Sequence, residues 1–228
     1  MPTINSSASK DGYVQSYLES SWAGLRQRTD AQWRVDADNE RDTAAVLLYH
    51  ASGMRGAVFG MVRAFFAFDT SGVTGTPESA TLNIRGFSND SSDLIAVATD
   101  YMPSLTTADW QAILGAEEEF ALSDGIGGGT LSGATGVKVY SEKFTSWSTS
   151  GYNQVDITAA GLAAMKDLDD WEFCLMDYDY DFLDIEPPQA QAATGLYWGD
   201  NSTYPPYIDY TVAGAAVTHN ATFFGANF

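Results

Sequence analysis

The alternation of apolar and polar residues is clearest between Met61 and Phe87, where it predicts two β-strands separated by a loop of turn residues. The apolar set on one face is Val62, Ala64, Phe66 and Phe68, followed after the loop by Ala80, Leu82 and Ile84. Gly72, Gly75 and Pro77 interrupt the pattern, because glycine and proline break continuing strands and helices. We expect the two strands to form a central hairpin whose inward faces fill the core of a β-sandwich.

Further segments of strand length follow the same logic. They cover residues 12–18, 44–49, 93–102, 137–144, 154–157, 171–176 and 206–212. Two short helices are expected at 104–114 and 158–168, with Thr106 or Thr107 capping the first and Thr158 capping the second. Many short strands with only two minor helices are typical of an all-β protein. We therefore predict a single antiparallel β-sandwich of jelly-roll type with one or two short helices.

The sequence divides into three parts around this sandwich. Residues 1–10 are small and polar and are expected to form an N-terminal arm, residues 11–212 hold the sandwich, and residues 213–228 form a C-terminal extension. Within the sandwich, residues 27–43 are the most charged part of the chain and predict a long exposed loop.

Charge narrows the range of partners. The 228 residues include 11 Lys and Arg against 30 Asp and Glu, so the formal net charge is −19. A surface of this sign repels phosphate groups, which argues against binding to nucleic acid or to anionic membrane surfaces. No apolar run reaches the roughly 20 residues that a membrane-spanning helix needs. The first residues lack the pattern of a signal peptide, so we expect synthesis in the cytoplasm and no membrane insertion.

A cluster of carboxylates is the best candidate for a ligand site. Asp177, Asp179 and Asp181 would share one face if this segment were a strand, and Asp184 follows closely. Clustered carboxylate oxygens suit Ca²⁺, although Phe182 stands where a calcium loop of the EF-hand type needs glycine. Two interpretations stay open: a calcium site, or a solvated acidic strand that prevents edge pairing by repulsion. No other cofactor is expected.

The sequence offers little for catalysis. The single cysteine, Cys174, lies in the apolar run 171–176, where a buried small side chain is expected. His50 and His219 are the only histidines, they lie in unrelated contexts, and no G-x-S-x-G motif is present. Thirty acidic residues leave no basis for choosing a glycosidase pair. We therefore predict that the protein is not an enzyme.

Tryptophans suggest a second kind of binding site. Trp33 and Trp147 lie in polar segments and are the two predicted to be exposed, where their rings could stack on sugars. Trp171, in an apolar strand, is expected in the core instead.

Several short motifs, taken in order, resemble a known family. They are DGYV at 11–14, VRAFFAFDTSG at 62–72, PESATLNI at 77–84, the TTADW segment with Trp110, VDIT at 155–158 and PPYIDYTV at 205–212. With these motifs, most of the chain resembles the DNRLRE-type domain, a carbohydrate-binding-like jelly roll found in bacterial surface proteins and in viral structural proteins. The charged segment 27–43 and the extension 213–228 depart from the family's usual outline.

The resemblance, combined with the lack of an export signal, implies a non-enzymatic structural protein of a virion, such as a phage capsid decoration, cement or fibre-associated protein. Its partners would be other capsid or tail proteins and further copies of itself. In the C-terminal extension, Phe223, Phe224 and Phe228 are expected to dock onto a neighbour during assembly. The alternative implied by the family is a carbohydrate-binding module that recognises host-surface or extracellular polysaccharide, that is, host glycans.

Overall fold

The computed structural model describes residues 1–26, 28, 30–31, 34–36, 43–53, 56–89, 93–101, 104–113 and 138–212. Its strands are β1 (Thr3–Asn5), β2 (Gly12–Glu19), β3 (Arg34–Asp36), β4 (Thr43–Gly53), β5 (Gly56–Asp69), β6 (Pro77–Ser88), β7 (Leu94–Ala98), β8 (Tyr152–Asp156), β9 (Asp170–Asp177), β10 (Ala190–Tyr197) and β11 (Tyr207–Val212). The helical elements are α1 (Trp22–Arg26), the 3₁₀ turn η1 (Thr107–Gln111), α2 (Ala159–Asp167) and the π-helical turn η4 (Tyr178–Phe182). The predicted all-β sandwich is confirmed, and every strand pair is antiparallel.

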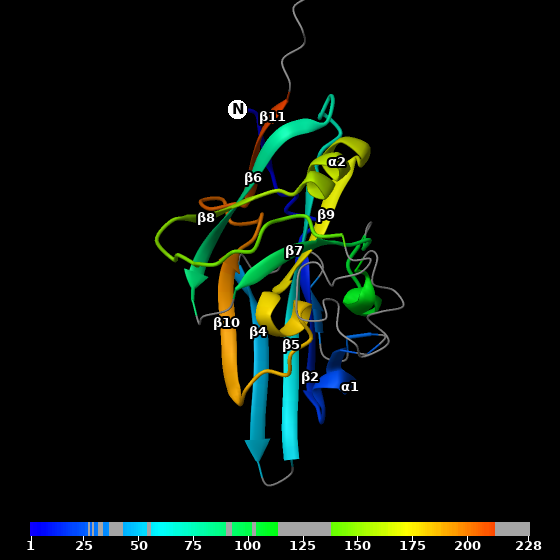
Figure 1. Cartoon of the computed structure of the whole chain (residues 1–228), viewed down its shortest axis with the longest axis vertical. Coiled ribbons are helices and arrows are strands. Elements are labelled where there is room, and N and C mark those ends of the chain that lie inside the picture. The colour runs from blue at the N-terminus through cyan, green and yellow to red at the C-terminus, as the bar shows by residue number, and fades with distance from the viewer. Residues whose placement is uncertain are drawn as a thin grey trace, which may run out of the picture.

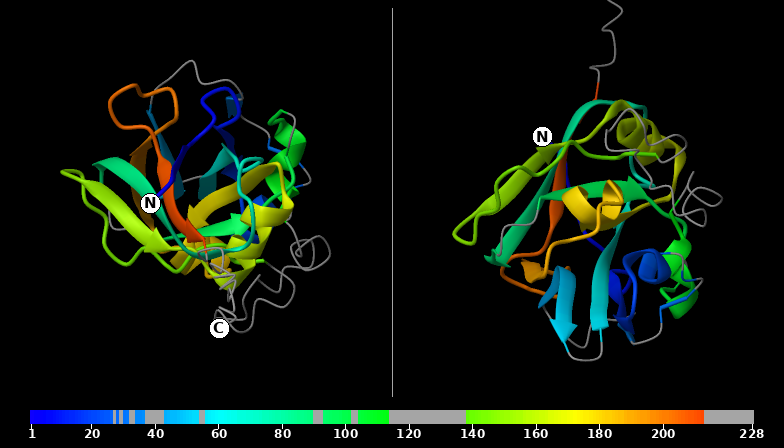
Figure 2. Two further views of the ribbon diagram at one scale, coloured as in Figure 1. Left: turned by 90° about the horizontal axis from the view of Figure 1, so that it is seen from above. Right: turned by 60° about the horizontal axis from the view of Figure 1, so that its bottom comes forward.

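The strands form two layers joined at a corner (Figure 1). Sheet A consists of β1, β11, β6 and β8, and sheet B of β3, β2, β5, β4, β10, β9 and β7. Strand β10 makes the corner, because it pairs along its length with β4 and through Gly195 and Leu196 with β6. Figure 2 shows how the strands curl round so that the two layers enclose the core.

The predicted central hairpin is wrong, although both of its strands exist. Strand β5 pairs with β2, β4 and β9 in sheet B, whereas β6 pairs with β8, β10 and β11 at sheet A and the corner. The loop between Asp69 and Pro77 therefore carries the chain from one layer to the other. Alternation specifies which side chains face the core, but it does not specify which strand lies alongside.

The central strands β5, β7 and β9 of sheet B are buried on both faces, which explains their long apolar runs. Phe66 and Phe68 of β5 face sheet A, where they pack with Leu82 and Ile84 of β6. The opposite face of β5, with Phe65, belongs to a second apolar cluster. Residues of α1, η1 and η4 cover this second cluster, including Leu25, Trp110 and Phe182. Both helix predictions are confirmed in position: Thr106 precedes η1, and the Thr158 hydroxyl accepts from the Gly161 N–H at the start of α2.

Three further sequence predictions need correction, and strand β10 has to be added. Residues 34–36 of the predicted exposed loop 27–43 form strand β3, which pairs with β2, and Asp36 is buried. Residues 3–5 of the predicted N-terminal arm are edge strand β1, paired with β11, and Ile4 packs on the core. Residues 137–144 were expected to form a strand, but the described part makes only isolated bridges at Val139, Ser141 and Phe144. Strand β10 was not predicted, because its sequence AQAATGLY is rich in alanine and lacks a clear apolar alternation. None of the helices in the described ranges is long and apolar enough to cross a membrane.

Candidate functional site

The acidic segment that follows β9 is a helical turn rather than a strand. Strand β9 ends at Asp177, whose Oδ1 accepts a hydrogen bond of 2.8 Å from the backbone N–H of Tyr180. An aspartate that caps the next turn in this way favours helix over a continuing ladder. Residues Tyr178–Phe182 accordingly form the π-helical turn η4. The prediction that Asp177, Asp179 and Asp181 share one strand face is therefore wrong.

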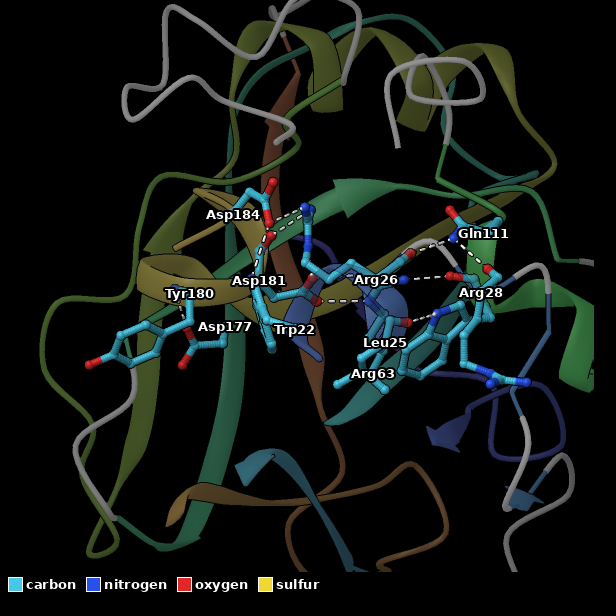
Figure 3. Close-up of polar contacts among 11 residues, drawn as sticks. Trp22, Leu25, Arg26, Arg28, Arg63, Gln111, Asp177, Tyr180, Asp181 and Asp184 are labelled. Carbon is cyan, nitrogen blue, oxygen red and sulfur yellow. Dashed lines mark hydrogen bonds and ion pairs between the residues drawn. The ribbon is translucent and has the colours of Figure 1, made fainter. Parts of the chain in front are cut away.

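Asp181 points into the protein and meets Arg63 of β5 (Figure 3). The Nε and Nη2 atoms of Arg63 donate to the two carboxylate oxygens of Asp181, each at 2.7 Å. Both side chains are buried, with exposed fractions of 0% and 1%. The remaining Nη1 of Arg63 donates to the Trp110 carbonyl, and the guanidinium lies 4.7 Å from the centre of that indole ring. Such a bidentate pair is the strongest hydrogen-bonding arrangement available to an arginine and a carboxylate.

A second arginine, Arg26 at the end of α1, completes the network. Its Nη1 lies 2.6 Å from Asp184 Oδ1, and its Nη2 donates to the Asp181 carbonyl at 2.9 Å. The indole N–H of Trp22 also donates to Asp184, at 3.1 Å. Two arginines thus face two aspartates, so the charges of these four side chains balance. The contacts join α1, β5, η1 and η4 on the outer side of sheet B (Figure 3).

The pKa values of two members of the network are shifted, and in each case burial acts against a charged neighbour. Burial acts to lower the pKa of Arg63, but the Asp181 carboxylate beside it outweighs burial, and the pKa is raised. Burial raises the pKa of Asp184, and the opposing influence of Arg26 only partly offsets that effect.

The carboxylates proposed as calcium ligands do not converge on a common point. Asp181 and Asp184 bind arginines, while Asp177 accepts from the backbone of Tyr180. Burial, and then the charge of Asp93, raises the pKa of Asp179. Within the described residues, no group of three or more His, Cys, Asp or Glu side chains is placed to hold a metal ion. The geometry of the segment is that of a structural link between elements inside the protein.

Trp147 is not exposed, so its prediction as a sugar-stacking residue is wrong. Its exposed fraction is 8%, and its ring packs edge-on against Phe144 with the centroids 5.5 Å apart. The indole N–H donates to the Gly195 carbonyl at 3.3 Å. The residues next to Trp147 in the sequence are polar, but in the folded protein its ring is enclosed, because β6 and β10 meet at this corner. Trp33, the other member of the pair, lies outside the described residues.

The other predicted residues fall into two groups. Phe223, Phe224 and Phe228 lie outside the described residues, so their role in assembly stays a prediction. Cys174 is fully buried in sheet B, as expected, and burial raises the pKa of its thiol far above the usual range. His50 is held in place by its neighbours: Nδ1 lies 2.7 Å from the Pro187 carbonyl, and the ring stacks on Phe59.

Sequence reasoning missed a group made of aromatic side chains and one arginine, on the outer face of sheet A and at the adjoining corner strand β10. We call this group the aromatic face; its members are Arg85 and Phe87 of β6, Tyr152 of β8, Tyr197 of β10, Tyr204 of the β10–β11 loop and Tyr207 of β11. Adjacent members touch: ring centroids lie 4.9 Å apart for Tyr152 and Tyr207, 5.3 Å for Tyr197 and Tyr204, and 5.7 Å for Phe87 and Tyr197. The Arg85 guanidinium lies 4.4 Å from the centre of the Tyr204 ring. The alternation of β6 was the available signal, since residues 85 and 87 lie opposite to the inward-facing Leu82 and Ile84.

Next to the aromatic face, the same outer surface carries carboxylates. Thr81 of β6 lies between Asp156 of β8 and Asp209 of β11 in the paired registers. These residues and Glu142 help to line a pocket of about 360 Å³. None of the three carboxylates forms an ion pair with a described side chain; Asp209 instead accepts a hydrogen bond from the Thr3 hydroxyl at 2.6 Å.

Comparisons with known proteins leave the family open. No protein-family model matches the chain, and no match to it was found among curated proteins. The resemblance to the DNRLRE-type domain therefore stays a prediction that rests on the short motifs in the sequence.

Proposed function

We propose that the chain is a non-enzymatic structural protein of a virus particle, of the capsid decoration, cement or fibre-associated kind. In this role it contacts other virion proteins and further copies of itself, rather than nucleic acid or membrane. The proposal begins with the resemblance stated above and with the all-β sandwich, a fold that serves well as a rigid scaffold.

One observation carries the proposal beyond the fold. The acidic segment, which was the best candidate for a ligand site in the sequence, uses Asp181 and Asp184 to bind Arg63 and Arg26 inside the protein. The side chains of Asp181 and Asp184 therefore connect the elements that cover sheet B to one another. A buried and fully paired network of this kind fixes the relative positions of its elements, which suits a protein whose task is to hold a shape.

The carbohydrate-binding alternative loses one of its two supporting residues, because Trp147 is enclosed between β6 and β10. The aromatic face presents tyrosines together with Arg85, but this combination is equally typical of protein interfaces. We therefore retain the structural role as the single proposal.

The proposal is tested by the protein composition of purified virus particles from the system that encodes the chain. Quantitative mass spectrometry is expected to find the chain at a fixed ratio to the major shell or fibre protein across independent preparations. As a control, particles are washed and then treated with protease before disruption. Washing removes an adsorbed contaminant, whereas protease trims a component that is bound at the particle surface. A chain that is absent from washed particles, or present at a varying ratio, would contradict the proposal.

A further inference from the structure

The outer surface of sheet A combines aromatic rings with carboxylates along three neighbouring strands. Along β6, outward positions run from Thr81 through Asn83 and Arg85 to Phe87, a length of about 20 Å for an extended backbone. Tyr207 pairs across from Asn83, and Tyr152 pairs across from Arg85. The surface is therefore ordered by strand pairing and divided into an aromatic end and an acidic end, with the side chain of Asn83 buried between them.

The aromatic end is solvent-accessible. Phe87 is 41% exposed, and the tyrosines of the aromatic face are partly exposed. Tyrosine and phenylalanine on a rigid sheet lose little conformational entropy on binding, and residues of this kind are enriched where proteins meet.

One contact between a cation and an aromatic ring already exists within this surface. The Arg85 guanidinium lies over the Tyr204 ring at 4.4 Å, and its buried Nε has no hydrogen-bond partner among the described residues. An aromatic ring attracts a cation through its electron-rich face, and arginine makes this contact most often. A second guanidinium or ammonium group that approached this surface would meet further tyrosine rings of the same kind.

The acidic end supplies the charge complement. Asp156 and Asp209 flank Thr81, and Glu142 joins them at the pocket of about 360 Å³, which Met1 also lines. None of the three carboxylates forms an ion pair with a described basic group. The chain as a whole carries a net charge of −19, which draws basic partners toward it over a long range. An anionic ligand would have to approach against this field.

We propose that the outer face of sheet A is a docking surface for an extended, arginine- or lysine-bearing segment of a neighbouring protein. The cationic groups bind Asp156, Asp209 and Glu142, and the adjoining side chains pack on the aromatic face. This inference rests on the proposed function, since it names the surface through which the chain contacts a virion partner. The two remain separable, because particle composition tests the function while binding in solution tests the surface.

The test uses the full chain and a synthetic twelve-residue peptide of alternating arginine and serine, followed by NMR of the ¹⁵N-labelled protein. Peptide addition is expected to shift amide signals of β6, β8 and β11 selectively. A triple variant, Asp156→Asn, Asp209→Asn and Glu142→Gln, is expected to weaken binding about ten-fold, since three exposed ion pairs are lost. The matched control neutralises three exposed carboxylates elsewhere, Asp100→Asn, Asp169→Asn and Glu186→Gln, and is expected to change the affinity less than about two-fold.

A second pair of variants tests the aromatic end. Phe87→Ser is expected to weaken peptide binding about three-fold, while Ile185→Ser, at a site of similar exposure (47%), leaves it unchanged. The alternating glutamate–serine peptide of the same length is expected not to bind. Three outcomes would overturn the proposal. They are amide shifts spread over the whole surface of the protein, equal weakening of peptide binding by both triple variants, and binding of cellohexaose at this face in place of the arginine peptide.

Discussion

Arg63 and Asp181 are separated by 118 positions in the sequence, yet they meet through two hydrogen bonds of 2.7 Å in the interior of the protein. Arg63 comes from the middle of β5, and Asp181 from the helical turn that follows β9. Strand β9 pairs directly with β5, so the turn emerges beside the strand that carries its partner. The pair thus holds η4 against sheet B and helps to close the second apolar cluster.

Removal of one partner from this pair should be costly. Asp181→Asn leaves the Arg63 charge buried without its carboxylate, and we expect a loss of about 3–5 kcal/mol in the free energy of unfolding. Urea denaturation followed by circular dichroism measures the change. Asp167→Asn, which removes an exposed carboxylate on α2, is the control and should shift stability by at most about 0.5 kcal/mol.

The double variant Arg63→Met with Asp181→Leu separates the cost of an unpaired charge from the worth of the pair. Apolar side chains of similar volume often replace a buried ion pair at little net cost, so the double variant should be more stable than Asp181→Asn. If the Asp181→Asn variant unfolds at the same urea concentration as the wild type, the pair of Arg63 and Asp181 does not hold η4 against sheet B.

Calcium should have no effect on stability through the acidic segment. Asp181 and Asp184 are held by arginines, and the carboxylates of the segment do not converge. A bound ion stabilises a protein by mass action, so an occupied site would raise the melting temperature. We expect melting curves in EDTA and in millimolar CaCl₂ to coincide. A calcium-dependent rise that disappears in Asp179→Asn would restore the calcium interpretation.

Much of the fold could be predicted from the sequence, because the core-facing pattern is local. The alternation of β5 correctly assigned Val62, Ala64, Phe66 and Phe68 to the core between the sheets. Strand pairing could not be predicted in the same way. Whether β5 lies next to β6 depends on contacts between distant segments, and a turn-rich loop serves equally well as a hairpin or as a crossing between layers.

The candidate site was harder to predict than the fold. The D-x-D-x-D pattern is compatible with a strand. The hydrogen bond from the Tyr180 N–H to Asp177 and the backbone bond from the Leu183 N–H to the Tyr178 carbonyl show that the segment turns. Nothing near Asp181 in the sequence indicates that its partner is Arg63. Trp147 was misplaced because its sequence neighbours are polar, whereas its spatial neighbours, Phe144 and Gly195, enclose it.

The corner between β6 and β10 should tolerate no added methyl group at Gly86. A Cβ atom there would overlap the indole nitrogen of Trp147 and the Ser148 carbonyl, and the backbone oxygen cannot rotate away. We expect Gly86→Ala to destabilise the protein by about 1–3 kcal/mol, measured by urea denaturation.

The matched control for this position is Gly72→Ala, where no atom lies within 4 Å of the new Cβ. This change should be neutral, or stabilising by up to about 1 kcal/mol, because alanine restricts the unfolded chain more than glycine does. Equal stability of the two variants would show that Trp147 is not enclosed at this corner.

Mild acidification should relieve unfavourable charge at Asp179. Its pKa is raised in the folded protein, by burial and then by Asp93, so the folded state binds its proton more readily than the unfolded state does. The contribution of this group to stability therefore falls as pH rises from about 3.9, the ordinary value, through the raised pKa, and it stays unfavourable at neutral pH. Asp179→Asn should raise the melting temperature at pH 7 and have less effect near pH 4. A variant that lowers the melting temperature at pH 7 would show that the charged form is favoured in the folded protein.

The assembly role of Phe223, Phe224 and Phe228 makes a prediction that is independent of the sandwich. If these side chains dock onto a neighbour, replacing all three with serine should abolish or strongly reduce incorporation into particles, because large apolar side chains supply much of the energy at such contacts. Because the sequence predicts these residues to lie in a C-terminal extension beyond the sandwich, the same variant should leave the urea midpoint of the isolated protein close to that of the wild type. Particle incorporation is measured by quantitative mass spectrometry, with the conservative change of all three residues to tyrosine as the control that keeps aromatic size. Full occupancy by the serine variant would remove these residues from the assembly mechanism and leave the outer face of sheet A as the remaining candidate contact.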